Sequence, residues 1–217
     1  MPKAVLFDFD GVLADTLSDM LRFGQEVCLA LGHARVPTTQ DLNQLDPMNL
    51  EEYGRQLGIP DNNIKRYARL MLEHFRSKPE PPALFAGMGE VVKNLVESSH
   101  LAIVTGNATA LVKTFLKHHG LDAYIHVIVG GEAHATRSQK IFVALNQLGV
   151  PAQGAWLVGD AISDIRAAQE SGLKSVAVTW GHQSEARLAA AGPDYIAHSP
   201  LELMAYLDGG ISVGQSH

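Results

Sequence analysis

The stretch "AVLFDFDGVLADT" (residues 4–16) decides the fold expected for this chain of 217 residues. Its apolar beginning is typical of a strand that is covered on both faces, as the strands of a parallel sheet are. The apolar run ends at two carboxylates, Asp8 and Asp10, and a third follows at Asp15. Because neighbouring carboxylates raise the cost of ionising each other, another group must offset their repulsion.

Further apolar runs of the same kind recur along the chain. They are "LAIVTG" (101–106), "IHVIVG" (125–130), "AWLVGD" (155–160), "KSVAVT" (174–179) and the weaker "DYIA" (194–197). Helical patterns lie between these runs, and Gly120, Gly149 and Gly172 mark helix ends. The alternation predicts an α/β fold, a Rossmann-like parallel sheet in a three-layer core with right-handed crossovers.

The first gap between strands is much longer than a crossover requires. Residues 16–80 have a helical pattern, with one apolar face from Leu17 to Leu31 and another from Ile64 to Phe75. We therefore expect a small inserted all-α cap over 16–80 and a catalytic core over 1–15 and 81–217. The alternative is that these helices only pack on the sheet. Thr16 and Asp19 resemble a capping box, and we expect Asp15 and Thr16 to cap the first cap helix at the hinge between the domains.

The composition excludes several classes of protein. The net charge is -6 and no Lys/Arg run occurs, which argues against a nucleic-acid-binding surface. No stretch approaches the roughly 18 apolar residues that a membrane span needs. The single cysteine, Cys28, rules out an internal disulfide and favours a reducing, cytoplasmic location. The ten histidines show no zinc-like spacing.

Polar side chains follow several of the predicted strands. Asp8 and Asp10 follow the first, Thr105 ends the second, and Asp160 ends the fourth, with Asp164 one helical turn later. In an open parallel sheet the carboxyl ends of the strands form the ligand site, so these groups should converge. Carboxylates gathered from two strands suit Mg²⁺, and a bound dication would offset the repulsion between Asp8 and Asp10.

The ordered set "DFDGVLADT", "VTGN", Lys140 and "GDAISD" closely resembles the four motifs of the haloacid dehalogenase-like hydrolases. The phosphoglycolate-phosphatase-like branch, which has a helical cap after the first motif, is the most similar. This resemblance implies that Asp8 attacks phosphorus to form an aspartyl-phosphate. It also implies that Asp10 protonates the leaving oxygen and then activates water.

The same resemblance implies the binding groups. Thr105 and Lys140 would bind the phosphoryl oxygens, helped by the backbone near Gly11 and by Gly106 and Asn107. Mg²⁺ would be held by Asp8, the Asp10 backbone carbonyl and Asp160, with Asp164 as a ligand or as a support. Lys140 lacks the proline-flanked setting frequent in this branch, and Arg137 is the alternative cation.

The expected function is a Mg²⁺-dependent phosphatase for a small phosphorylated metabolite, with phosphoglycolate as the leading candidate. A phosphosugar mutase of the same superfamily is the alternative, and a phosphate-sensing or partner-binding protein without turnover is a further one. The polar cap residues that could set specificity are Arg22, His33, Arg35, Tyr53 and Arg55. Trp180 and His182 either line the pocket or only pack beside it. The sequence does not indicate the oligomeric state.

Overall fold

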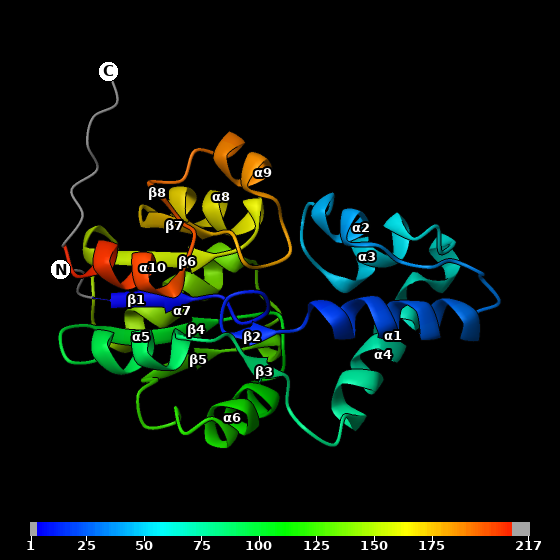
Figure 1. The fold of residues 1–217 in the computed structure, drawn as a ribbon, viewed down its shortest axis with the longest axis horizontal. Coiled ribbons are helices and arrows are strands. Elements are labelled where there is room, and N and C mark those ends of the chain that lie inside the picture. The colour runs from blue at the N-terminus through cyan, green and yellow to red at the C-terminus, as the bar shows by residue number, and fades with distance from the viewer. Residues whose placement is uncertain (1–3, 210–217) are drawn as a thin grey trace.

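A computed structural model describes residues 4–209 and contains a six-stranded parallel sheet (Figure 1). The sheet order is β5-β4-β1-β6-β7-β8. Its strands are β1 (Ala4–Phe7), β4 (His100–Val104), β5 (Val127–Val129), β6 (Ala155–Gly159), β7 (Lys174–Val178) and β8 (Tyr195–Ala197). β1 lies between β4 and β6, so Phe7 pairs with Ile103 on one side and with Val158 on the other. The expected α/β fold is confirmed, including the weak sixth strand.

Helices cover both faces of the sheet because alternate residues of β1 point to opposite sides. The covering helices are α5 (Met88–Leu95), α6 (Thr109–His118), α7 (Arg137–Leu148), α8 (Ile162–Ser171) and α10 (Pro200–Leu207). Val5 and Phe7 pack with α5, α6 and α10, whereas Ala4 and Leu6 pack with α7 and α8. A shorter helix, α9 (Glu185–Ala190), buries Leu188 against Ile165 and Ala177. Two short 3-10 helices, η1 (Gly131–Ala133) and η2 (Ala152–Gly154), precede α7 and β6. The result is a three-layer core.

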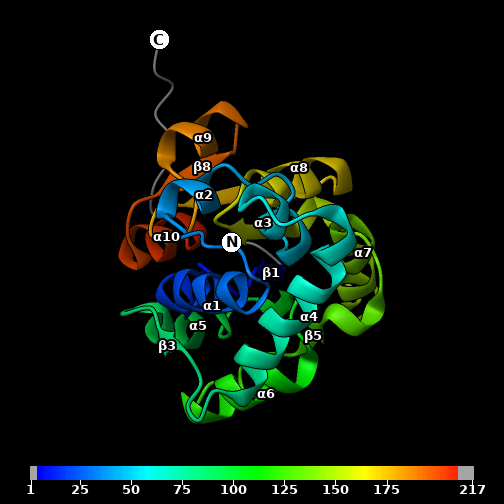
Figure 2. The same ribbon diagram turned by 90° about the vertical axis from the view of Figure 1, so that its right-hand side faces the viewer.

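Four helices follow β1 and lie beyond the edge at which the strands end (Figures 1 and 2). They are α1 (Leu17–Ala30), α2 (Thr39–Asn43), α3 (Leu50–Gln56) and α4 (Asp61–Ser77). They share a hydrophobic core of their own, in which Tyr53, Tyr67 and Met71 are fully buried. We refer to α1–α4 as the cap, and we propose 16–80 as its bounds. Within residues 4–209, none of the helices combines the length and apolar character needed to cross a bilayer.

Two chain segments connect the cap to the sheet. They pair as a small antiparallel ladder, β2 (Ala14–Asp15) with β3 (Ala83–Leu84). The expected capping role of Asp15 is wrong, because Asp15 lies exposed in β2. Thr16 is the N-cap residue of α1, as expected, and its carbonyl accepts a hydrogen bond from Met20 N–H at 2.8 Å, but its side chain makes no capping hydrogen bond. The Thr16 hydroxyl instead lies 3.4 Å from His182 Nε2. The Asp19 carboxylate, its expected capping partner, binds Arg22 and Lys78.

Direct contacts hold the cap loop after α2 against the core. The Gln183 side chain accepts a hydrogen bond from Ile162 N–H at 2.7 Å and donates one to the Leu45 carbonyl, also at 2.7 Å. Nearby, Arg166 and Asp46 form an ion pair at 2.6 Å. The buried amide of Gln183, which follows β7, therefore links the start of α8 directly to the cap.

Candidate active site

A cavity of about 610 Å³ lies between the cap and the carboxyl ends of the strands. Its volume is within the range of small-molecule sites. The sheet side of the lining consists of Asp8, Asp10, Thr105, Gly106, Asn107, His134, Ala135, Arg137 and His182. Five of the residues predicted from the sequence therefore share one cavity. Lys140, Asp160 and Asp164 are buried and do not line it.

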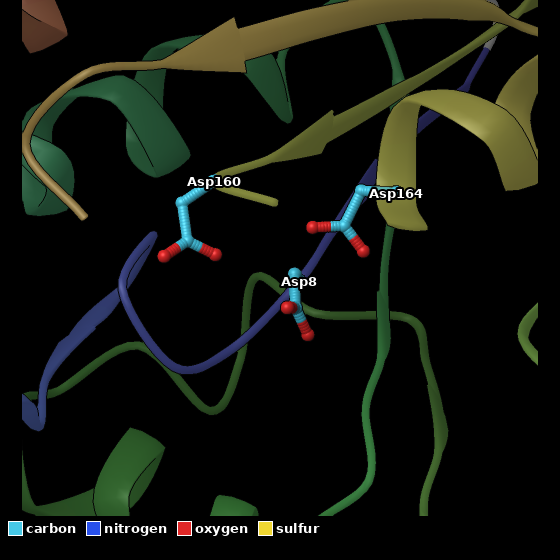
Figure 3. Close-up of side chains that lie close together, drawn as sticks. All are labelled: Asp8, Asp160 and Asp164. Atoms are coloured by element: carbon cyan, nitrogen blue, oxygen red, sulfur yellow. The ribbon is translucent and has the colours of Figure 1, made fainter. Parts of the chain in front are cut away.

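Three carboxylates converge on one another (Figure 3), and one of them, Asp8, lines the cavity. Asp8 follows β1, Asp160 follows β6 and Asp164 lies in the first turn of α8. One oxygen atom from each lies within 4.8 Å of the others, and all three residues are buried. Burial raises the pKa of Asp8, and it raises that of Asp164 to about 8, although Arg137 opposes both shifts. A buried set of oxygen ligands is the chemistry that Mg²⁺ prefers, and a bound dication would favour the ionised carboxylates.

The backbone comes unusually close to Asp160. Gly11 has a positive φ of 74°, and a Cβ atom placed there would lie 2.0 Å from Asp160 Oδ2. A side chain at this position would therefore collide with a carboxylate of the cluster. This explains why glycine follows Asp10: it allows the chain to turn over the Asp160 carboxylate.

Arg137 is the cation that contacts the predicted nucleophile. Its Nη1 lies 3.1 Å from Asp8 Oδ1, its Nη2 lies 3.2 Å from Asp8 Oδ2, and its Nε lies 3.0 Å from Asp164 Oδ1. Nη1 also donates a hydrogen bond to the Val104 carbonyl at 3.0 Å. Burial acts against the charged guanidinium, but Asp164 and Asp8 outweigh it and raise the pKa of Arg137. The guanidinium therefore holds two buried carboxylates together.

Lys140 occupies a different place from the one expected. Its Nζ donates a hydrogen bond to the Thr105 carbonyl at 2.7 Å. Burial and the neighbouring Arg137 lower the pKa of its ammonium group. Lys140 thus supports the backbone at the end of β4, while Arg137, one helical turn earlier, faces the cavity.

Asp10 lies beside Asp8 but outside the carboxylate cluster. Its Oδ2 accepts a hydrogen bond from Asn107 Nδ2. Burial and the charge of Asp8 raise the pKa of Asp10 to about 6. Asn107 N–H donates to the Thr105 hydroxyl at 3.0 Å, so the segment after β4 reaches from Thr105 to Asp10. A carboxyl group that titrates near neutral pH is suited to general acid–base chemistry.

His182 contacts the carboxylate of Asp160. Both the His182 backbone N–H and its Nδ1 lie 2.7 Å from Asp160 Oδ2. Burial lowers the pKa of His182, but the Asp160 carboxylate outweighs it and raises the pKa to about 9. His182 lines the cavity, which resolves the alternatives left open for it. Trp180 does not line it; its Nε1 donates to the Val12 carbonyl at 3.3 Å.

The polar cap residues considered for specificity lie outside the cavity lining. Arg22 binds Asp19, Arg35 binds Asp41, and Arg55 binds Glu52. His33 contacts the Leu57 carbonyl, and Tyr53 is buried in the cap core. These groups are used in structural contacts within the cap.

Two features of the sequence could have identified the roles of Arg137 and His182. Thr136 and Gln139 form a capping box, so α7 begins at Arg137. The Arg137 side chain is therefore the first on a helix that begins at the edge of the sheet where the strands end. His182 follows the strand next to the one that ends at Asp160, and therefore reaches the same edge.

Comparisons with known proteins show what this chain is similar to. A family model described as haloacid dehalogenase-like hydrolase matches residues 5–178. The chain is 26% identical over 203 residues to a phosphoglycolate phosphatase of Synechococcus elongatus, covering 93% of this chain and 95% of the relative. It is 29% identical over 196 residues to one from Xanthomonas campestris, covering 84% and 85%. A haloacid dehalogenase-like family hydrolase from Streptococcus pneumoniae has a similar structure, with a TM-score of 0.86, 25% identity and coverage of 95% and 98%.

Proposed function

Because the chain belongs to the haloacid dehalogenase-like hydrolases, we propose that this phosphatase hydrolyses the phosphomonoester of a small metabolite through an aspartyl-phosphate on Asp8. The observation that carries the proposal is the meeting of Asp8, Asp160 and Asp164 within 4.8 Å, with Asp8 and Asp10 lining one cavity. The phosphoglycolate phosphatases among its relatives support the same reaction class. The cytoplasmic location expected from the sequence stays a prediction.

Asp8 supplies the nucleophilic oxygen. One oxygen, Oδ1, accepts a hydrogen bond from Phe9 N–H at 2.8 Å, and Arg137 contacts both oxygens. These contacts fix the carboxylate and stabilise its ionised form against the cost of burial. Attack by an Asp8 oxygen forms the bond to phosphorus while the bond from phosphorus to the alcohol oxygen breaks.

Asp10 handles the protons. It is two residues from Asp8 and lines the same cavity, so it can protonate the departing alcohol oxygen. Once ionised, the same carboxylate accepts a proton from the water that cleaves the aspartyl-phosphate. Its raised pKa, about 6, lets both protonation states be populated near neutral pH.

The transferring phosphoryl group requires donors for its oxygens. We assign this role to the Thr105 hydroxyl, the backbone at Gly106 and Asn107, and the Arg137 guanidinium, all of which line the cavity. Donors fixed before the reaction stabilise the developing charge without reorganising. Lys140, expected in this role from the sequence, is proposed instead to hold the Thr105 carbonyl in place.

The buried carboxylates fit a magnesium ion. Asp8, Asp160 and Asp164 offer oxygen ligands only, and the raised pKa values of Asp8 and Asp164 indicate that Arg137 alone does not neutralise them. We propose that Asp8, Asp160 and the Asp10 backbone carbonyl hold Mg²⁺, with Asp164 as a ligand or support. When bound, this ion would neutralise charge on the phosphoryl group and favour its approach to an anionic nucleophile.

The test is phosphate release from p-nitrophenyl phosphate by wild type and by Asp8→Asn, with Mg²⁺ and with EDTA. We expect the wild type to be active with Mg²⁺ and inactive with EDTA, and Asp8→Asn to be inactive in both. The control Asp15→Asn, which changes an exposed carboxylate of the same stretch, should keep full activity with Mg²⁺. Near-full release by Asp8→Asn, or release that EDTA does not reduce, contradicts the proposal. Isomer interconversion with little net phosphate release would instead identify the mutase alternative.

A further inference from the structure

The two ends of the cavity differ in chemistry. The sheet end carries the carboxylates and the phosphate donors, whereas the cap end is mostly apolar. The apolar cap residues that line it are Met20, Met48, Leu50, Ala68, Leu72 and Phe75. These side chains are partly buried without a ligand, so an apolar group placed against them would remove further apolar surface from water.

Among the described residues, the cap contributes no cationic side chain to the lining of this cavity. The polar groups that the cap presents there are Asn49 and Glu51, both exposed, and the Glu51 carboxylate lies 3.9 Å from the guanidinium of Arg55, which is outside the lining. The lining residues that can carry a positive charge, His134, Arg137 and His182, all come from the sheet side.

These sheet-side groups are positioned at the phosphate end. Arg137 binds Asp8 and Asp164, and His182 binds Asp160. The His134 N–H donates a hydrogen bond to the Gly131 carbonyl, and the Gly131 N–H donates one to the Asn107 carbonyl. These bonds place the loop that contains His134 against residues 105–107, to which we assign phosphate binding. A second anion on the substrate, pointing toward the cap, would therefore exchange water for apolar side chains and meet no cation of the lining.

We infer that the alcohol part of the substrate is uncharged and mainly apolar, an aliphatic or aromatic group, rather than a carboxylate such as glycolate. This inference rests on the proposed function, because it concerns the leaving group of the same reaction. Phosphoglycolate, the leading candidate from the sequence, does not match the cap lining. Met20 and Met48 add flexible side chains that can adapt to apolar groups of different shape.

A matched pair of substrates tests the inference. Isobutyl phosphate and phosphoglycolate have leaving groups of nearly the same size and branching, but only the second carries a carboxylate. With wild type and Mg²⁺, we expect kcat/KM for isobutyl phosphate to exceed that for phosphoglycolate by at least about tenfold. Along the n-alkyl phosphates from ethyl to hexyl, kcat/KM should rise by about fourfold per buried methylene group.

A charge placed in the cap should change this preference. Leu72→Arg introduces a cation into the lining and is expected to shift the kcat/KM ratio toward phosphoglycolate by about tenfold or more. Leu29→Arg adds the same charge on α1 at a residue that is 58% exposed and outside the lining, and should leave the ratio unchanged.

The outcomes separate the inference from the proposed function. A wild-type ratio below about tenfold, or a ratio that Leu72→Arg and Leu29→Arg alter equally, overturns the apolar substrate class while phosphatase activity stands. Absence of Mg²⁺-dependent release from every ester overturns the proposed function, and the inference with it. A ratio above tenfold that only Leu72→Arg reduces supports both.

Discussion

Arg137→Met should destabilise the metal-free protein by about 3–5 kcal/mol at pH 8, the cost of removing one partner from a buried ion pair. The magnitude follows from what the side chain holds together. Its guanidinium contacts Asp8 and Asp164 at 3.0–3.2 Å, and these two carboxylate side chains are 9% and 1% exposed. Without the guanidinium, both must stay buried as unpaired charges or take up protons. Protonation is easier at low pH, so the loss should be clearly smaller at pH 6 than at pH 8.

The assay is urea unfolding followed by circular dichroism, in EDTA, at both pH values. Arg166→Met is the matched control, because the Arg166 side chain is 56% exposed and its ion pair with Asp46 should contribute less than about 1 kcal/mol. Asp8→Asn in the Arg137→Met background should recover part of the lost stability. If Arg137→Met costs no more than Arg166→Met at pH 8, the account of the buried carboxylates is refuted.

Three other predictions follow from the site. The metal-free protein should lose stability as pH rises from about 4 to 8, because the folded pKa values of Asp10 and Asp164, about 6 and about 8, lie above their usual value of 3.8. Asp164→Asn should flatten this slope in urea titrations, and an equal slope in the variant would contradict the assignment. His182→Ala should raise the Mg²⁺ concentration needed for half-maximal activity by about 10- to 100-fold, because His182 orients Asp160. An unchanged Mg²⁺ requirement would argue against that role. Gln183→Ala should lower the free energy of unfolding by about 1–3 kcal/mol, since it leaves the Ile162 N–H and the Leu45 carbonyl without their partner. The control is Gln169→Ala, which removes an exposed amide and should lower the free energy of unfolding by a smaller amount.

The sequence was sufficient to predict the sheet because buried parallel strands are continuous apolar runs. Even "DYIA" (194–197), the weakest run, contains the edge strand β8. The carboxyl ends of the strands then placed Asp8, Asp10, Thr105 and Asp160 at one edge of the sheet. Only the topology of the sheet was needed for this step, and not the positions of individual side-chain atoms.

The roles of Lys140 and Arg137 could not be separated in the same way. Both lie at the start of α7, one helical turn apart, and which one reaches Asp8 depends on the direction of each side chain. The N-cap position of Thr16 was predicted, but not the contact of its hydroxyl, which can either cap α1 or face His182 across the hinge. Such choices depend on contacts between distant segments, which local patterns do not contain.

The apolar pattern of α4 shows a further limit of periodicity. Ile64, Tyr67 and Met71 are buried in the cap core. Leu72 and Phe75 belong to the same apolar pattern but line the cavity, and Phe75 also packs against the core. A helix that packs on its neighbours and also covers a ligand site presents a wider apolar face. The sequence alone does not show which residues of that face pack in the core and which line the site. The cap residues from which we infer the substrate class therefore resemble core residues.

The most direct test of the central claim is to trap the phosphorylated form of Asp8. Asp10→Asn with p-nitrophenyl phosphate and Mg²⁺ should form the intermediate, because the leaving group needs no protonation, but should hydrolyse it slowly. We predict a burst of one p-nitrophenolate per protein molecule, a gain in intact mass of one phosphoryl group after acid quenching, and a borohydride-reducible modification in the peptide that contains Asp8. A phosphoryl group on any other residue, or steady release without a phosphorylated protein, would contradict the account.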